Sequence, residues 1–214
     1  MEFNKKYEKQ MISIDVSIFS IINNQLNVLL IQRAIEPYKK MWSLVGGGVY
    51  NNETCEQAAK RELKEKIGVT NINPVLTGVF SEPKRDLRFR NISISYYCLT
   101  KNNLLFNKNK EKVLTAKWFP INSLPNLAFD HGAIIKKSLE GLKSKVFDIS
   151  YIKDFLPETF TLTSLQSIYE SILETSLDKR NFRRKLNSMN CLIKTGEKNE
   201  YDTRKKSEIY KFIQ

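Results

Sequence analysis

A glycine-rich loop that runs directly into an amphipathic helix, within residues 46–69, is the feature that most restricts how this chain can fold. The run Gly46–Gly48 ends an apolar segment, and consecutive glycines predict a tight loop. From Glu53 to Ile67 the apolar positions recur at helical spacing, and Gly68 then supplies a C-terminal stop. The pattern predicts one helix, bounded by loops, that is inserted between strands.

Apolar segments of strand length lie on both sides of this helix. The first two flank an Asn23-Asn24 turn, which predicts a β-hairpin. The expected strands are residues 12–22, 25–33, 41–49, 91–100 and 113–120. A second helix is expected over 131–146. After Pro157 the composition becomes helical and rich in arginine, so we divide the chain into a first domain at 1–148 and a second at 149–214.

Composition excludes several classes of protein. No apolar run approaches the roughly 20 residues of a membrane span, and residues 1–10 lack the apolar centre of a signal peptide. We therefore expect a cytoplasmic protein with no membrane partner. The three cysteines are widely spaced and there is one histidine, so neither a disulfide framework nor a zinc site is expected. The formal net charge of +12 favours a polyanionic partner.

The loop and the first helix resemble the Nudix signature. That signature is a Gly, five residues, a Glu, seven residues, and then Arg-Glu-apolar-x-Glu-Glu-x-Gly-apolar. The chain matches it in register at Gly47, Glu53, Arg61, Glu62, Leu63, Glu65, Gly68 and Val69. The resemblance implies a Nudix-type α/β/α sandwich for the first domain, and an α+β fold class for the chain as a whole.

The carboxylate spacing on this helix has a chemical purpose. Positions 62, 65 and 66 are related as i, i+3 and i+4, so their side chains project from one face. Carboxylates there would hold magnesium against a diphosphate and activate the attacking water. Lys66 occupies the last position, which removes an oxygen ligand and adds a positive charge. We therefore expect no catalytic residue, no bound metal and no cofactor. A simpler reading pairs Lys66 with Glu62 on the helix surface, and the two readings are compatible.

A cleft can bind a ligand even where hydrolysis is lost. Arg85, Arg88 and Arg90 precede an expected strand, where their guanidinium groups could form bidentate bonds to phosphates or hydroxyls. Arg33 and Trp42 are further candidates for contacting an effector, the latter as a stacking surface. The alternatives are solvated loop arginines and a tryptophan that belongs to the core.

The segment after Pro157 predicts two helices followed by a hairpin. Thr163 and Gln166 form a capping-box pattern ahead of an apolar stripe, which predicts the first helix. A short turn at 175–177 leads to Asp178, which can cap a second helix. The inward stripe of that helix is Phe182, Leu186 and Met189. Two apolar strands, at 191–195 and 208–212, then enclose a polar basic loop, as in a winged helix.

The second of these helices is the candidate for reading DNA. Five of the seven residues from Lys179 to Lys185 are basic and none is acidic, which is what a helix in a major groove presents to phosphates and bases. The candidate DNA contacts are Lys179, Arg180, Asn181, Arg183, Arg184 and Asn187 on the helix, and Arg204, Lys205 and Lys206 on the wing. The alternative is a basic hairpin that binds no nucleic acid.

Together the two halves resemble the Nudix-related transcriptional regulators of bacteria, from about Ile12 to Phe212. The residues that carry this resemblance are LPETFTLTSLQSIYE at 156–170 and LDKRNFRRKL at 177–186, after the Nudix motif. The resemblance implies a homodimeric repressor that binds palindromic operator DNA. It also implies an effector, either ADP-ribose or a related nucleotide, or a pentose such as arabinose.

Two other functions are compatible with the residues. The first is an active Nudix hydrolase of ADP-ribose-type nucleoside diphosphate derivatives, with Glu62, Glu65 and a further carboxylate as metal ligands. The second is an RNA-binding or scaffolding protein, since basic winged helices also serve those roles. The identity of the effector, the operator and the regulated pathway are left open by the sequence.

Overall fold

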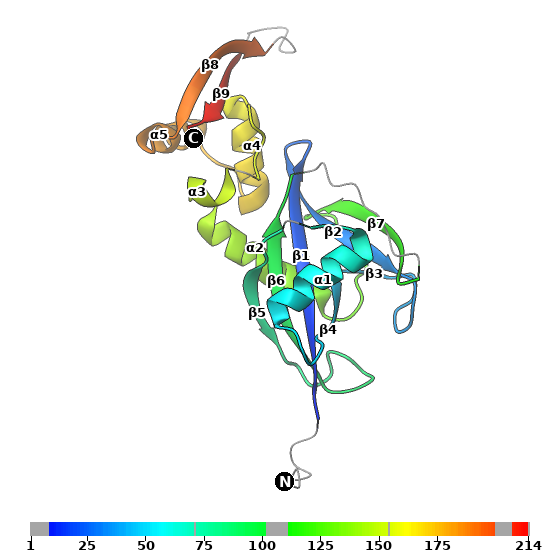
Figure 1. Cartoon of the computed structure of the whole chain (residues 1–214). Coiled ribbons are helices and arrows are strands. Elements are labelled where there is room, and N and C mark those ends of the chain that lie inside the picture. Colours follow the sequence, from blue (N-terminus) through cyan, green and yellow to red (C-terminus); the bar gives the residue numbers. More distant parts are fainter. Residues whose placement is uncertain (1–8, 71, 102–110, 154, 200–206, 214) are drawn as a thin grey trace.

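A mixed β-sheet forms the centre of the N-terminal part of the computed structural model, which describes residues 9–70, 72–101, 111–153, 155–199 and 207–213 (Figure 1). Its seven strands are β1 (Met11–Ile22), β2 (Gln25–Arg33), β3 (Trp42–Ser43), β4 (Val45–Gly48), β5 (Val75–Phe80), β6 (Asn91–Leu99) and β7 (Val113–Pro120). β1 pairs antiparallel with β2 towards one end and with β4 towards the other, and it pairs parallel with β6 along most of its length. β3 and β7 pair with β2, and β5 pairs with β6.

The turn between β1 and β2 confirms the predicted hairpin. Ile22 pairs with Gln25, and the two residues between them, Asn23 and Asn24, have φ values of 51° and 60°. A two-residue turn with positive φ at both positions follows the right-handed twist of the strands, and asparagine tolerates that conformation better than most residues.

Two strand predictions need correction. The segment 41–49, expected as one strand, is divided into β3 and β4, because the N–H of Leu44 donates to Nδ1 of His131 at 2.9 Å instead of to a neighbouring strand. β5 is not predicted by the sequence pattern. Its Leu76 and Val79 are exposed on a strand at the edge of the sheet, so the segment lacks the apolar run that marks the other strands.

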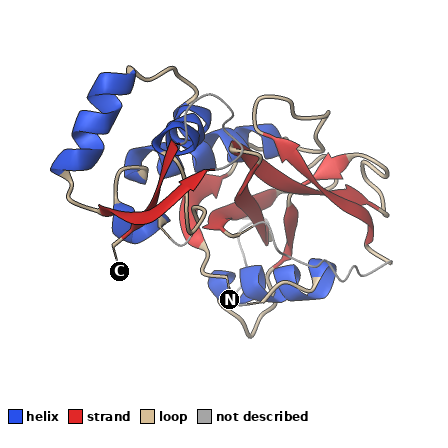
Figure 2. Ribbon diagram, turned by 90° about the horizontal axis from the view of Figure 1, so that it is seen from above, coloured by secondary structure: helices blue, strands red, loops and turns tan. Residues whose placement is uncertain are grey.

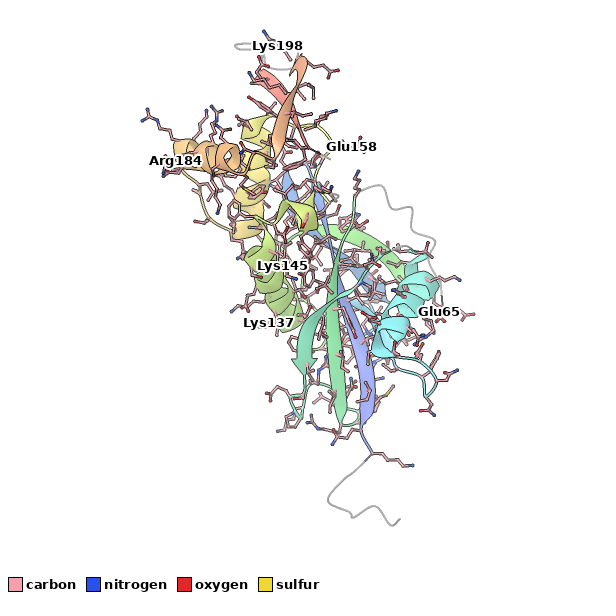
Figure 3. The ribbon with its side chains drawn as sticks, turned by 60° about the vertical axis from the view of Figure 1, so that its left-hand side comes forward. Glu65, Lys137, Lys145, Glu158, Arg184 and Lys198 are labelled. Atoms are coloured by element: carbon pink, nitrogen blue, oxygen red, sulfur yellow. The ribbon has the colours of Figure 1, made fainter. Side chains whose placement is uncertain are left out.

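Two helices cover opposite faces of the sheet, which confirms the expected α/β/α sandwich. These are α1 (Cys55–Ile67) and α2 (His131–Lys145), seen on either side of the strands in Figure 2. In Figure 3, Glu65 on α1 and Lys137 on α2 point away from the sheet in opposite directions. Thr54 caps α1 by accepting a hydrogen bond from the N–H of Gln57, and Gly68 ends it at φ 71°. The apolar residues of α1 that the spacing predicts to face inward are all buried: Ala58, Ala59, Leu63 and Ile67.

The described residues of the C-terminal part contain the two helices and the hairpin expected from the sequence, preceded by a short helix, α3, that the sequence pattern did not predict. These are α3 (Ile149–Ile152), α4 (Leu162–Leu173), α5 (Lys179–Ser188), β8 (Leu192–Asn199) and β9 (Ser207–Phe212). The predicted cap of α4 is wrong by two residues, because Thr161 rather than Thr163 accepts the N–H of Ser164. The predicted cap of α5 is present: Asp178 accepts the N–H of Asn181 at 2.9 Å. Phe160 bridges to Tyr210 through two backbone hydrogen bonds and extends the hairpin by one pairing.

One hydrophobic core joins the two parts of the chain. It runs from Phe19 and Leu26 in the sheet, across α2 and α3, to Ile168 in α4 and Phe182 in α5. The N–H of Leu26 in β2 also donates to Oγ of Ser171 in α4 at 2.6 Å. Residues on both sides of the proposed boundary between 148 and 149 belong to this core, so the boundary divides the sequence but does not separate two hydrophobic cores. No helix in the described ranges is long and apolar enough to cross a membrane.

Candidate functional site

The segment Gly46–Gly48, which we call the glycine loop, is not the tight loop expected from the sequence: it is part of strand β4 and pairs with β1. At Gly47 it approaches α1 so closely that a side chain would collide with the helix. A Cβ atom on Gly47 would lie 2.1 Å from Oε1 of Glu62, and one on Gly46 would lie 2.2 Å from the carbonyl oxygen of Ile14. Real Cβ atoms do not make such contacts with oxygen. Glycine is therefore required at both positions so that the loop can pass between β1 and the buried carboxylate of α1.

Arg61 connects the helix to the loop that precedes it. Its Nε and Nη2 atoms donate to the two carboxylate oxygens of Glu53, at 2.9 and 2.7 Å, and Nη2 also donates to the carbonyl of Gly48 at 2.8 Å. Its Nη1 donates to Oε1 of Glu62 at 2.7 Å. These hydrogen bonds from Arg61 hold the pKa of Glu53 below its usual value. Three of the motif residues, Glu53, Arg61 and Glu62, therefore form one ion-pair network.

Lys66 points inward beneath the glycine loop. Its Nζ donates to the carbonyl oxygen of Gly46 and lies 3.3 Å from Oε2 of Glu62, and its side chain is only 15% exposed. Burial lowers the pKa of Lys66, although the nearby carboxylate of Glu62 opposes this effect. The predicted pair between Lys66 and Glu62 is present. Its predicted place on the helix surface is wrong, because the lysine reaches under the loop rather than into solvent.

The carboxylates of the motif do not fit a divalent metal. One oxygen of Glu62 faces Arg61 and the other faces Lys66, while Arg61 binds both oxygens of Glu53. Glu65 lies further out, 39% exposed, with Oε2 3.6 Å from Nη1 of Arg61. Magnesium needs about six oxygen ligands in octahedral geometry, and here cations occupy the carboxylate oxygens that would supply them. Within the described residues, no cluster of three or more His, Cys, Asp or Glu side chains is placed to hold a metal ion.

A pocket opens next to the glycine loop, between β1, the segment before β6 and the start of α2. Four basic and two acidic side chains line it: Arg33, Lys66, Arg85, Arg88, Asp15 and Asp86. Phe89 and Phe129 add two aromatic rings to the wall. Phe89 is exposed, whereas the Phe129 ring already contacts Arg33, Tyr38 and His131. A pocket with several cations and an exposed ring is suited to a ligand that carries both phosphate and an aromatic base.

Arg85 is the most firmly held cation of this pocket. Its Nε and Nη2 donate to the two oxygens of Asp130 at 2.9 and 2.6 Å, and Nη2 lies 3.4 Å from Oδ2 of Asp15. Its side chain is 3% exposed. Asp130 stands at the N-terminus of α2 but makes no capping bond to that helix, because its carboxylate is bound to Arg85. Arg85 thus links the loop before β6 to β1 and to α2.

Asp15 and His131 complete the buried end of the pocket. Oδ2 of Asp15 accepts a hydrogen bond from Ser93 at 2.6 Å, and Oδ1 lies 3.3 Å from Nε2 of His131. Burial alone would raise the pKa of Asp15, but contacts with His131, Ser93 and Arg85 outweigh it and hold that pKa below its usual value. Neither of these two residues, nor Asp130, is predicted from the sequence. The available signal was an aspartate inside an otherwise apolar strand, since a buried charge requires partners.

Two other candidate residues line the pocket less tightly. Arg88 makes two bonds to Asp86, at 3.0 and 2.7 Å, and its guanidinium lies 4.8 Å from the centre of the Phe89 ring. Arg33 donates from Nε to the carbonyl of Pro37 at 2.8 Å. Both guanidinium groups keep donors that a ligand could use, because Arg has five N–H donors.

The structure places Trp42 and Arg90 outside this pocket, contrary to our expectation of an effector contact. Trp42 packs edge-on against Phe119 with ring centres 4.7 Å apart and belongs to the margin of the core, which was the alternative reading. Arg90 donates from Nη1 to the carbonyl oxygen of Ser81 at 2.6 Å and fastens the base of its own loop. Neither residue is part of the pocket lining.

The basic face of α5 is exposed to solvent. All six candidate contacts on the helix are exposed: Lys179, Arg180, Asn181, Arg183, Arg184 and Asn187. The opposite side is buried through Phe182 and Leu186, and the ring of Phe182 packs edge-on against Tyr169 at 5.2 Å. Figure 3 shows Arg184 projecting from α5 into solvent and Lys198 near the tip of the β8–β9 hairpin. Met189, expected to face inward, is half-buried at the end of the helix. The wing candidates Arg204, Lys205 and Lys206 lie outside the described residues.

Two family models match the chain in succession. The NUDIX domain matches residues 11–139, and the NrtR DNA-binding winged helix domain matches residues 152–212. The first match contains the glycine loop, the ion-pair network and the basic pocket. The second contains the basic face of α5.

Three characterised relatives are similar to the chain. The ADPR responsive transcriptional repressor NtrR of Acinetobacter baylyi is 30% identical over 212 residues, which is 96% of this chain and 83% of the relative. The ADP-ribose pyrophosphatase of Methanocaldococcus jannaschii is 40% identical over 121 residues, or 56% of this chain and 70% of the relative.

The third relative, NrtR of Shewanella oneidensis, has solved structures. Its complex with a 27mer DNA has a TM-score of 0.73 and 28% identity, covering 94% of this chain and 93% of that one. Its NUDIX domain in complex with ADP ribose has a TM-score of 0.59 at 28% identity, covering 66% of this chain and 94% of that one.

Proposed function

Because the chain belongs to the Nudix family, and within it to the regulators that carry an NrtR-type winged helix, we propose that it is a transcriptional repressor whose Nudix domain senses ADP-ribose or a related nucleotide. The observation that carries this proposal is the pairing, in one chain, of the exposed basic face of α5 with a basic pocket in the Nudix part. Similarity to the Acinetobacter repressor extends over both parts, which supports a shared function rather than a shared domain.

We propose that α5 enters the major groove of operator DNA. Arg180, Arg184 and Asn187 then face base edges and phosphates, because they lie opposite the buried Phe182 and Leu186. A helix of ten residues reads only a few base pairs. Two copies related by a two-fold axis, on a palindromic operator, would supply the missing specificity, so we propose a homodimer.

We propose that the effector binds in the basic pocket through its phosphates. Four cations line it, and a pentose such as arabinose has no phosphate to neutralise them. The names of the Acinetobacter and Methanocaldococcus relatives, and the ADP ribose complex of the Shewanella NUDIX domain, favour the nucleotide over the sugar. Phe89 offers an exposed ring for the adenine.

We propose that effector binding releases DNA through α2. This helix begins in the pocket at His131, and near its other end Lys143 pairs with Glu174, which follows α4. A ligand shifts an equilibrium only by its difference in affinity for the two states, so the effector must bind the DNA-free arrangement more tightly. A shift at the start of α2 is transmitted to α4, and through the shared core to α5.

The proposal is tested by equilibrium binding. A duplex that the protein selects from a random-sequence pool should contain an inverted repeat, and its affinity measured by fluorescence anisotropy should fall when ADP-ribose is added. Arabinose at the same concentration should leave the affinity unchanged. Selection of no preferred duplex would refute the repressor, and release by arabinose but not by ADP-ribose would move the effector to the pentose class.

A second candidate is hydrolysis of ADP-ribose, which the similarity to the Methanocaldococcus pyrophosphatase favours. We propose that this activity is absent, because the carboxylates of α1 are bound to Arg61 and Lys66. Incubation of the purified chain with ADP-ribose and magnesium should release no AMP above the rate of the uncatalysed control. Sustained AMP release over many turnovers would establish the hydrolase instead.

A further inference from the structure

Lys66 places a positive charge at a position where the Nudix signature has a carboxylate that would help to hold a metal. Its ammonium contacts the carbonyl oxygen of Gly46 and one oxygen of Glu62, and the side chain lines the basic pocket. An ammonium group has three N–H donors. One of them donates to the Gly46 carbonyl, whereas Oε2 of Glu62 lies 3.3 Å from Nζ as an ion-pair partner and accepts no hydrogen bond. The ammonium therefore keeps donor capacity for a ligand in the pocket.

The local charge is balanced without any added ion. The carboxylates of Glu53 and Glu62 are offset by Arg61 and Lys66, which lie within 3.3 Å of them. The third carboxylate, Glu65, lies 3.6 Å from Arg61 and 4.0 Å from Lys112, which supplies the third positive charge. A carboxylate at position 66 would exchange one positive charge for a negative one, a change of two units. One divalent cation carries the same two units. The lysine therefore supplies the charge that a metal would otherwise have to bring.

We infer that Lys66 is a built-in cation that replaces the divalent metal, so that a phosphate-bearing effector binds in the pocket without magnesium. The ammonium faces the diphosphate from beneath the Gly46–Gly48 loop, and its unused N–H donates to a phosphate oxygen. An ammonium group holds no water ligand to activate, so the effector is bound and left intact. This inference rests on the proposed function of the pocket as a nucleotide site.

Contacts on two sides hold the ammonium group of Lys66 in place. Its position is fixed by the loop carbonyl on one side and by Glu62 on the other, and Glu62 is itself held by Arg61. Lys64, two residues earlier on the same helix, is exposed and does not line this pocket. It is a matched control for the charge of Lys66.

The test compares ADP-ribose binding in EDTA and in magnesium by isothermal titration calorimetry on the full chain. The native protein should bind with the same affinity in both. Lys66→Glu should bind about tenfold or more weakly in EDTA and should recover in magnesium, because the metal restores the lost charge. Lys66→Met should be weakened in both buffers, and Lys64→Glu in neither. Native binding that disappears in EDTA and returns with magnesium would overturn the inference.

A second measurement separates this inference from the proposed function. Binding of Mn²⁺ alone, followed by loss of the free-ion electron paramagnetic resonance signal, should be undetectable for the native chain and measurable for Lys66→Glu. Thermal melting establishes that both are folded. If ADP-ribose fails to bind in any buffer, the nucleotide proposal is wrong, but the manganese result still decides the role of Lys66. Equal manganese binding by the two proteins would refute the replacement of the metal.

Discussion

The helices α1 and α5 are both rich in arginine and lysine, but they use charge in opposite ways. Arg61 and Lys66 of α1 are mostly buried and directed at the carboxylates of Glu53, which precedes the helix, and of Glu62. On α5 the sequence from 179 to 185 contains no acid, and the arginines project into solvent. A cation with internal partners stabilises the fold, whereas a cluster of exposed cations with few such partners is available to an external polyanion.

The largest expected effect breaks the second half of this comparison. Arg180→Ala combined with Arg184→Ala should weaken binding to a selected duplex about a hundredfold or more, because each arginine makes base or phosphate contacts worth about 1–3 kcal/mol. The urea midpoint should hardly change, since both side chains are exposed. Lys136→Ala with Lys137→Ala, on the exposed side of α2, is the matched control and should retain affinity. Undiminished DNA binding by the α5 variant would refute its assignment as the recognition helix.

Arg61→Ala tests whether the internally paired cations of α1 stabilise the fold. This change leaves the buried carboxylate of Glu62 without its hydrogen bond from Arg61, so we expect a loss of about 2–4 kcal/mol in the free energy of unfolding. Chemical denaturation followed by circular dichroism measures it. Arg183→Ala on α5 should cost less than about 0.5 kcal/mol in the same assay. Similar losses for the two variants would mean that the ion-pair network of α1 has no special structural role.

Adding one methyl group at Gly47 tests how closely the glycine loop approaches α1. Gly47→Ala should lower the free energy of unfolding by about 1–3 kcal/mol, because the added Cβ would meet Oε1 of Glu62 at 2.1 Å. Gly132→Ala, in α2, meets its nearest neighbour at 3.9 Å and should be neutral or slightly stabilising. Thermal melts of the two variants in one buffer give the comparison. A neutral result for Gly47→Ala would show that Glu62 can move away from the loop.

The smallest expected effect is a pH dependence. The pKa of Asp15 is held below its usual value, so its contribution is fully present above the unfolded-state pKa of about 3.9 and is lost as the pH falls through the lower folded-state pKa. Asp15→Asn should therefore be less stable than the native chain at pH 7, by about 1 kcal/mol, and the gap should narrow below pH 4. Urea titrations at several pH values measure this gap. A gap that stays constant down to pH 3 would contradict the assignment.

Local patterns predicted the elements that depend on neighbouring residues. The inward face of α1, the stop at Gly68 and the cap at Asp178 are each set by residues within one or two helical turns, so the sequence was sufficient for them. β5 was missed because it is an exposed edge strand, and Gly78 coincides with a shift in its pairing with β6. Its place depends on the partner strand rather than on its own composition.

The pocket was predicted only in part, because its contacts join residues that are far apart in the sequence. Arg33, Arg85 and Arg88 were proposed from residue type alone and do line it. The sequence could not reveal that Arg85 binds Asp130, which is 45 residues away, or that it lies beside Asp15, 70 residues away. The inward direction of Lys66 could not be predicted either. Helical spacing shows which face of α1 carries a residue, but it does not show that Gly46 of β4 packs over that face.

The core shared by both parts has a consequence for how the protein melts and how it can be divided. Tyr169 of α4 packs against Phe147 at 5.1 Å and against Phe182 of α5 at 5.2 Å, so one ring separates the end of the sensor from the DNA-reading helix. The end of the Nudix part and α5, joined by this stack, should unfold in one cooperative transition. A nucleotide bound in the basic pocket, whose lining residues all precede α3 in the chain, would then raise the melting temperature of α5 as much as that of the Nudix part. A sensor fragment cut off before α3 would expose an apolar surface that the whole chain keeps covered.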